Sequence, residues 1–226
     1  ITMQVVVESN DIYKIPITVP GRTINEFTLI EEVAEITGIA IPAYVQYKLH
    51  KVMQIYADLI DSDILLNPIS HYADVNNLLR LSMHYWTYRN KYTYRKEQLL
   101  TYDWISQESL DNMANRMINI INDDNIVFEK YGSASLDEFG LKCVLNGFAD
   151  CITVNSIYEI KCVSELSFEH QLQLLLYAWI FDRENIRTNA NIMSYKLVNA
   201  LNGEVQEIKC SNFPKLLELL TKNKIR

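Results

Sequence analysis

Three charged residues lie inside two apolar segments of the chain, and this placement constrains the fold more than any other feature. Asp150 falls within residues 144–154, and Glu159 and Lys161 fall within residues 157–163. Both segments are rich in β-branched and apolar residues, a composition that predicts strands. A charge buried in such strands costs free energy unless something pairs with it. The three charges therefore mark a candidate functional site.

The loop between the two predicted strands sets how the charges meet. Only residues 155–156 separate the strands, so we expect a two-residue hairpin loop. In that register Asp150 faces Lys161, and Glu159 is the diagonal neighbour of Asp150 at about 7–8 Å. Side chains alternate along a strand, so all three lie on one face of the sheet.

Two carboxylates at that separation can hold a hard divalent cation, which prefers oxygen ligands. Asp150 and Glu159 would be the ligands, helped by the carbonyl of Ile160, and Lys161 would orient a water or stabilise charge at a phosphate. This arrangement is typical of metal-assisted phosphodiester hydrolysis. The alternative is a structural Asp150–Lys161 pair, with Glu159 solvated at a sheet edge.

A helix is predicted over residues 167–181, with Gln173 and Tyr177 four residues apart on one face. The series Gly147-x-x-Asp150, Glu159-x-Lys161 and Gln173-x-x-x-Tyr177 resembles the PD-(D/E)XK nuclease superfamily. More narrowly, it is similar to the RecB and phage lambda exonuclease branch, to which the CRISPR adaptation exonucleases belong. The resemblance covers residues 129–209, and an alanine stands where the family has a proline before the aspartate.

The resemblance implies an α/β fold with a restriction-endonuclease-like core, in which helices flank a mixed central sheet. It also implies cleavage of DNA, acting at DNA ends as an exonuclease, with Mg²⁺ or Mn²⁺ as cofactor. Lys161 would position the attacking water, and Gln173 and Tyr177 would orient Lys161 or the scissile strand. Glu129 has two interpretations: the extra acidic ligand that many relatives supply upstream, or a surface charge on an edge strand.

Residues 80–96 form a basic segment with interleaved aromatic residues and no acidic residue. Basic side chains hold phosphates, and aromatic rings offer stacking surfaces for bases. The candidate DNA-binding residues are Trp86, Arg89, Lys91 and Arg95. Trp86 and Arg89 resemble a Trp and an Arg that meet the DNA end in the lambda exonuclease branch. The alternative is a helix with an aromatic core face and a solvated basic face.

The 226 residues suit one large domain or two small ones. Residues 1–100 are predicted to be mostly helical and to shape a DNA groove, and residues 101–226 to form the nuclease core. The first region should open with a hairpin over residues 4–8 and 12–19, followed by helices over residues 31–37 and from Pro42. The second should contain a helix over 106–121, strands over 126–130, 192–198 and 204–209, a loop over 133–138, and a last helix from Pro214.

The net charge of −7 argues against bulk attraction to nucleic acid, so DNA contacts need a local basic patch. The four cysteines form no C-x-x-C motif, so we expect no zinc site. Some relatives in the RecB branch carry an iron–sulfur cluster on a C-terminal group of cysteines; this sequence has no such group, so we expect no cluster. We expect no membrane span and no signal peptide, and hence an intracellular protein.

The chain begins with Ile1 rather than methionine, so we expect a fragment with a domain missing upstream. The Tyr- and Asn-rich composition resembles giant-virus proteins, in which such a nuclease follows a helicase-like region; an oligomer stays open. Two other functions remain alternatives: an RNA-cleaving endonuclease, and a non-catalytic domain that binds nucleic acid on the same fold.

Overall fold

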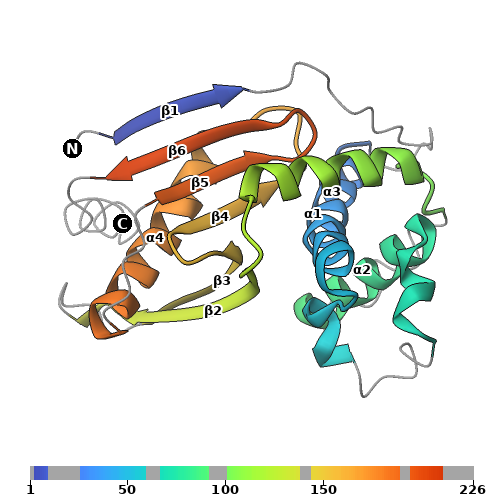
Figure 1. Cartoon of the computed structure of the whole chain (residues 1–226), viewed down its shortest axis with the longest axis horizontal. Coiled ribbons are helices and arrows are strands. Elements are labelled where there is room, and N and C mark those ends of the chain that lie inside the picture. Colours follow the sequence, from blue (N-terminus) through green and yellow to red (C-terminus); the bar gives the residue numbers. More distant parts are fainter. Residues whose placement is uncertain are drawn as a thin grey trace.

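The computed structural model describes residues 3–9, 26–59, 67–91, 101–137, 144–188 and 194–210. Within them, one sheet has the strand order β1-β6-β5-β4-β3-β2 (Figure 1). β4 and β5 run parallel, and the other neighbouring strands in this order run antiparallel. The strands are β1 (Met3–Ser9), β2 (Val127–Ser135), β3 (Val144–Ile152), β4 (Ser156–Lys161), β5 (Ser194–Asn199) and β6 (Glu204–Cys210).

Helices cover both faces of this sheet. They are α1 (Glu26–His50), α2 (Val75–Asn90), α3 (Gln107–Ile121) and α4 (Phe168–Thr188), with short 3₁₀ helices η1 (Gln54–Leu59) and η3 (Ile69–Ala73). Figure 1 shows α1, α2 and α3 gathered at one side of the sheet and α4 apart from them. The predicted α/β class, with a mixed sheet flanked by helices, is therefore confirmed.

Strand β4 shows how the two layers meet. Ile157 belongs to the apolar cluster under α4, whereas Tyr158 and Ile160 belong to the larger cluster under α1, α2 and α3. Because side chains alternate along a strand, Glu159 and Lys161 share the α4 face with Ile157. The strand that carries the two charges is thus central and covered on both sides.

Two helices predicted near the N-terminus, over residues 31–37 and from Pro42, are one continuous helix, so that prediction was wrong. Pro42 lies inside α1. A proline there removes a backbone hydrogen bond and costs about 3 kcal/mol. Ile41, Ala43 and Val45 beside it are fully buried, at 0% exposure. The packing of these side chains outweighs the local cost and keeps the helix unbroken.

Only the first strand of the predicted N-terminal hairpin lies within the described residues. Its first strand is β1, which pairs antiparallel with β6 along its whole length. The second strand, over residues 12–19, lies outside the described residues, as does the last helix from Pro214. β1 therefore places part of the first 100 residues in the sheet. The division near residue 100 stays a prediction.

Most of the remaining elements match the sequence. The helix over 106–121 is confirmed as α3, and the side chain of Ser106 accepts the Ser109 N–H at 3.0 Å as its N-cap. The predicted strands on either side of Gly203 are confirmed as β5 and β6. The loop predicted from residue 133 was wrong, because pairing of β2 with β3 continues to Ser135. Among the described residues, no helix has both the length and the apolar character needed to cross a bilayer.

Candidate active site

The β3–β4 hairpin has a different register from the predicted one. Cys151 pairs with Tyr158 and Ile152 with Ile157. A two-residue loop was wrong because the backbone N–H of Thr153 donates to the Ser156 carbonyl at 2.9 Å, which closes a longer loop. The register shifts by two residues relative to the prediction. Since side chains alternate with a period of two, that shift leaves each side chain on its predicted face.

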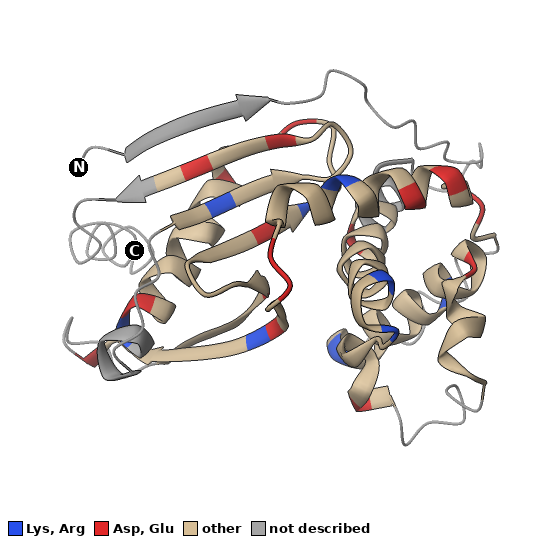
Figure 2. Ribbon diagram, in the orientation of Figure 1, with Lys and Arg blue, Asp and Glu red and all other residues tan. Residues whose placement is uncertain are grey.

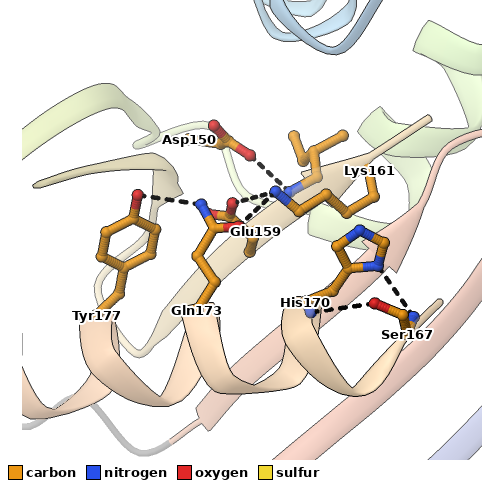
Figure 3. Close-up of polar contacts among 8 residues, drawn as sticks. Asp150, Glu159, Lys161, Ser167, His170, Gln173 and Tyr177 are labelled. Atoms are coloured by element: carbon orange, nitrogen blue, oxygen red, sulfur yellow. Dashed lines mark hydrogen bonds and ion pairs between the residues drawn. The ribbon is translucent and has the colours of Figure 1, made fainter. Parts of the chain in front are cut away.

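Strands β3 and β4 separate beyond Cys151, and Asp150 lies where they part. Their ladder ends at the Cys151–Tyr158 pair. The Oδ2 atom of Asp150 then accepts the backbone N–H of Ile160 at 2.7 Å (Figure 3). A side chain thus takes the place that a strand carbonyl would occupy, and the carboxylate comes to lie beside β4.

Glu159 is buried in the middle of the sheet, with 2% of its surface exposed. Its Oε1 atom accepts a hydrogen bond from Lys161 Nζ at 2.7 Å. Among the described residues, its buried Oε2 atom has no hydrogen-bond partner. A buried polar atom without a partner costs about 1–3 kcal/mol, and more when charged. The part of the structural alternative that placed a solvated Glu159 at a sheet edge is therefore wrong.

A chain of hydrogen bonds connects Lys161 to α4. Its Nζ atom donates to Gln173 Oε1 at 2.8 Å, and Gln173 Nε2 donates to the Tyr177 hydroxyl at 3.2 Å. Figure 3 shows the three side chains in line, with Gln173 and Tyr177 rising from α4 toward Lys161 on β4. Two acceptors, Glu159 and Gln173, therefore hold the ammonium group in place.

Two glycines let α4 come close enough to the sheet for the hydrogen bonds from Lys161 to Gln173 and Tyr177 to form. Gly132 and Gly147 face each other across β2 and β3. A Cβ atom at position 132 would lie 2.8 Å from the Phe181 ring, and one at position 147 would overlap the Tyr177 ring. The first residue of the Gly147-x-x-Asp150 series thus has a direct steric task, which is to make room for Tyr177.

Glu129 enters the site through a distorted position in β2. Phe128 pairs with Cys151 and Lys130 with Ala149, so Glu129 stands across from Asp150. Its φ of 48° lies in the left-handed region, which is uncommon for a residue other than glycine and costs free energy. The distortion turns Glu129 into the pocket described below.

Arg89 of α2 reaches the same carboxylate from the other side. Its Nη1 atom lies 3.9 Å from Glu129 Oε2 and donates to the Tyr85 hydroxyl at 2.7 Å. Its guanidinium also lies over the Phe148 ring, 4.3 Å from the ring centre. Arg89 therefore connects the helical layer to the acidic centre of the site.

The carboxyl groups of the site are poorly solvated and repel one another. Burial, and then the charge of Asp150, raises the pKa of Glu129 and of Glu159 to about 8. Burial also raises the pKa of Asp150 to about 6, against the opposing effects of Lys161 and the Ile160 N–H. Burial works against the charge of Lys161, but Glu159 and Asp150 outweigh it and raise its pKa. One ammonium is thus set among three carboxyls, and a further cation would relieve their repulsion.

These residues open onto a pocket of about 430 Å³. Its walls come from α1, α2, β2, β3, β4 and α4, and from the residues after β4. Eight of its lining residues are predicted site residues: Trp86 from the basic segment, and Glu129, Asp150, Glu159, Ile160, Lys161, Gln173 and Tyr177.

Sequence reasoning missed three titratable residues of the pocket, one of which is the buried thiol of Cys162 next to Lys161. Glu35 comes from α1, and its place in an ordinary helical pattern gave no signal. His170 comes from α4, three residues before Gln173 and therefore on the same helical face. That spacing was a signal that could have found it.

The residues of the pocket have the oxygen ligands that a divalent cation needs, but their side chains are not gathered around one point. Within the described part of the chain, no three His, Cys, Asp or Glu side chains are grouped as a ready metal site. Asp150 Oδ2 and Glu159 Oε1 are each turned to an N–H donor instead. The unpaired Oε2 atom of Glu159 and the mutual repulsion of the three carboxyls still suit a hard cation with oxygen ligands.

The predicted DNA-binding residues fall into different surroundings. Trp86 is 9% exposed and packs in the core cluster, and it also lines the pocket. Arg89 faces Glu129, and Lys91 is exposed at the C-terminal end of α2 with a φ of 59°. Arg95 lies outside the described residues. Figure 2 shows Asp and Glu interspersed with Lys and Arg over both the helical group and the sheet.

We find no protein-family model, curated protein or solved structure that matches the chain.

Proposed function

We propose that this protein is a metal-dependent nuclease that hydrolyses phosphodiester bonds in DNA. The observation that carries the proposal is the buried carboxylate of Glu159, whose Oε2 atom has no partner in the described part of the chain. Beside it, Lys161 is held by Glu159 and Gln173 at 2.7 and 2.8 Å. Carboxyl groups with strongly shifted pKa values cluster at functional sites, because catalysis needs pKa values matched to its task.

Each residue has a role that follows from its position. Asp150 and Glu159 would hold Mg²⁺ or Mn²⁺ with the Ile160 carbonyl, and Glu129 would add a carboxylate from β2. A bound cation of this kind polarises a phosphoryl oxygen and lowers the pKa of a water.

The remaining roles belong to the hydrogen-bonded series of Lys161, Gln173 and Tyr177. Lys161 places a fixed positive charge at the pocket, where it would orient the attacking water or stabilise charge on the phosphate. Gln173 fixes the direction of the ammonium, and Tyr177 fixes Gln173. DNA as substrate, with cleavage at its ends, is proposed from the resemblance of the motif series to the RecB and lambda exonuclease branch.

The proposal is tested by cleavage of end-labelled DNA and RNA of matched sequence, with Mg²⁺, Mn²⁺ or EDTA. The wild type should cut DNA with either metal, and EDTA should stop it. Glu159→Gln should cut at least about 1,000-fold more slowly, because it removes one of the two central carboxylates. Asp111→Asn is the matched control, since Asp111 is a carboxylate bonded to Lys48 at 2.6 Å away from the pocket.

The outcomes separate the alternatives. Faster cleavage of RNA than of DNA would assign the site to an RNA nuclease. Cleavage that persists in EDTA, or that is equal in Glu159→Gln and the wild type, would contradict a metal-dependent site at these residues. Binding of DNA without any cleavage would favour the non-catalytic alternative.

A further inference from the structure

His170 lies on the pocket-facing side of α4, next to the hydrogen-bonded side chains that hold Lys161. It precedes Gln173 by three residues and Tyr177 by seven, so the three share one helical face. All three line the pocket together with Lys161. None of the roles proposed above for the metal ligands or Lys161 involves His170.

One nitrogen of the His170 ring has a structural partner. The backbone N–H of Ser167 donates to His170 Nδ1 at 3.0 Å, and the backbone N–H of His170 lies 3.5 Å from Ser167 Oγ as its donor. This reciprocal pair resembles a capping box, with histidine at the position where glutamate or glutamine is usual. The cap uses only Nδ1 and fixes the orientation of the ring.

The cap also decides which nitrogen carries the proton. Since Nδ1 accepts a hydrogen bond, the neutral ring must carry its proton on Nε2. Burial and then the charge of Lys161 lower the pKa of His170, so the ring is neutral at neutral pH. Figure 3 shows the second nitrogen on the side of the ring away from Ser167, toward Lys161. Among the described residues, no hydrogen-bond acceptor is paired with it.

We propose that His170 is a substrate-binding residue, which donates its Nε2–H to a non-bridging oxygen of a phosphate in the bound nucleic acid. The proposal rests on the proposed nuclease function and names one further contact to that substrate. A neutral donor suits this place, because a second cation would be repelled by Lys161, whereas an N–H still binds a phosphate oxygen strongly. The contacted phosphate would lie beside the one that Lys161 faces.

Two substitutions separate the cap from the donor. His170→Gln keeps an acceptor for the Ser167 N–H and a side chain long enough to reach the pocket, so it should cleave within a few-fold of the wild type. His170→Asn keeps the short acceptor but loses the reach of Nε2. It should lower single-turnover cleavage by about 10- to 100-fold, the range for losing a hydrogen bond to a charged group.

Two controls test whether the substitution at His170 affects the fold: the melting temperature, and a substitution at a histidine far from the pocket. His170→Asn should melt near the wild-type temperature, because its cap remains. His71→Asn is the matched control, since His71 is exposed on η3 and does not line the pocket. It should leave cleavage unchanged.

A substrate series gives a readout that a purely structural role would not move. Each DNA substrate carries one methylphosphonate, which replaces a charged phosphate oxygen by a methyl group. In the wild type, a methylphosphonate at one position should slow cleavage by about 10-fold or more relative to the unmodified substrate. In His170→Asn, the methylphosphonate at that position should not slow cleavage further. Equal losses in both proteins at every position, or wild-type rates in His170→Asn, would overturn the His170 contact. A wild type that cleaves neither DNA nor RNA would instead contradict the nuclease function, and the contact with it.

Discussion

The two sides of the pocket hold their charged groups in different ways. On the α4 side, Lys161 is bonded to Glu159 and Gln173 at 2.7 and 2.8 Å, and Glu159 is 2% exposed. On the α2 side, Arg89 approaches Glu129 only to 3.9 Å, with side chains 35% and 22% exposed. A partly exposed pair of that kind contributes about 0–1 kcal/mol, so it holds neither partner firmly.

The difference indicates a division of tasks between the two sides. Under the proposed function, the chemical step needs groups held close to one geometry, and the groups of the α4 side are held in this way by a central strand and a helix packed against it. The α2 side carries a carboxylate in a strained backbone and a long basic side chain that pair only loosely with each other. Arg89 is held instead by the Tyr85 hydroxyl at 2.7 Å and by the Phe148 ring. We therefore expect substitutions on the α4 side to affect the rate, and those on the α2 side to affect binding.

Among substitutions that leave the metal ligands in place, the largest effect is expected from Lys161→Met, which keeps the apolar stem and removes the charge. Cleavage should fall by about 100-fold or more, the scale for losing a positioned electrostatic or proton-transfer group. Metal binding should persist, since the oxygen ligands remain. Single-turnover cleavage and a calorimetric metal titration would measure the two effects. Lost metal binding in a folded variant would show that Lys161 supports the ligands rather than the reaction.

Gly147→Ala should disturb the α4 side of the pocket through the contact between β3 and α4. The added Cβ would overlap the Tyr177 ring, so α4 or the ring must shift. We expect about 1–3 kcal/mol lower stability from overpacking, and about 10-fold slower cleavage through the displaced Gln173. Denaturant unfolding and cleavage rates would test it. Gly38→Ala is the control for stability alone, because a Cβ there meets nothing within 4 Å. Unchanged stability in Gly147→Ala would remove the steric role of this glycine.

The pH dependence of stability should report the repulsion among the carboxyls. Glu129 and Glu159 have pKa values raised from 4.5 to about 8, so the folded state binds more protons than the unfolded chain between these pH values. Stability of the metal-free protein should therefore fall as pH rises from about 4.5 to about 8, and then level off. His170, whose pKa is lowered, acts in the opposite direction as the pH falls through 6.5.

Melting temperatures at pH 5 to 9 would show this fall, at about 2–4 °C for each kcal/mol lost. Saturating Mg²⁺ should reverse it, because the cation stabilises the ionised carboxyls. Glu159→Gln, which cannot ionise, should show a shallower fall than the wild type. A steeper fall in that variant would contradict the assigned pKa shift of Glu159.

The smallest effects are expected on the α2 side. Lys91→Gln and Arg89→Gln should each weaken DNA binding a few-fold and flatten the plot of log affinity against log salt by about 0.9 per lost phosphate contact. Fluorescence anisotropy at several salt concentrations would measure the slope. Lys48→Gln serves as the control, since Lys48 is paired with Asp111. Slopes equal to the wild type would mean that α2 does not face the DNA.

The same comparison explains what the sequence could predict. The α4 side is encoded within residues 147–177, where alternation in β4 and the helical spacing from Gln173 to Tyr177 are strong local patterns. The predicted hairpin register was wrong by two residues, yet Glu159 and Lys161 kept their face because the strand period is two. The local pattern was therefore sufficient to bring these side chains together.

The α2 side depends on contacts distant in sequence. The left-handed φ of Glu129, which turns its carboxylate into the pocket, has no signal in the residues around it. Glu35 reaches the pocket from α1, whose packing against the sheet has no signal in the residues around Glu35. Trp86 matched a DNA-binding pattern, but most of its ring packs in the core. Tertiary packing decided each of these positions.

The central claim is that Glu159 and Asp150 together hold a divalent cation. Calorimetric titration with Mn²⁺ tests it most directly, using the wild type, Glu159→Gln and the control Asp111→Asn. Because the pKa of Glu159 is raised to about 8, glutamine mimics the largely protonated side chain of the metal-free protein at neutral pH and should preserve the fold. The wild type and Asp111→Asn should bind Mn²⁺ saturably. Glu159→Gln should bind at least about 10-fold more weakly, since even the loss of an outer-shell partner typically costs about 10–100-fold in metal affinity. Equal affinity in a folded Glu159→Gln would contradict the metal site.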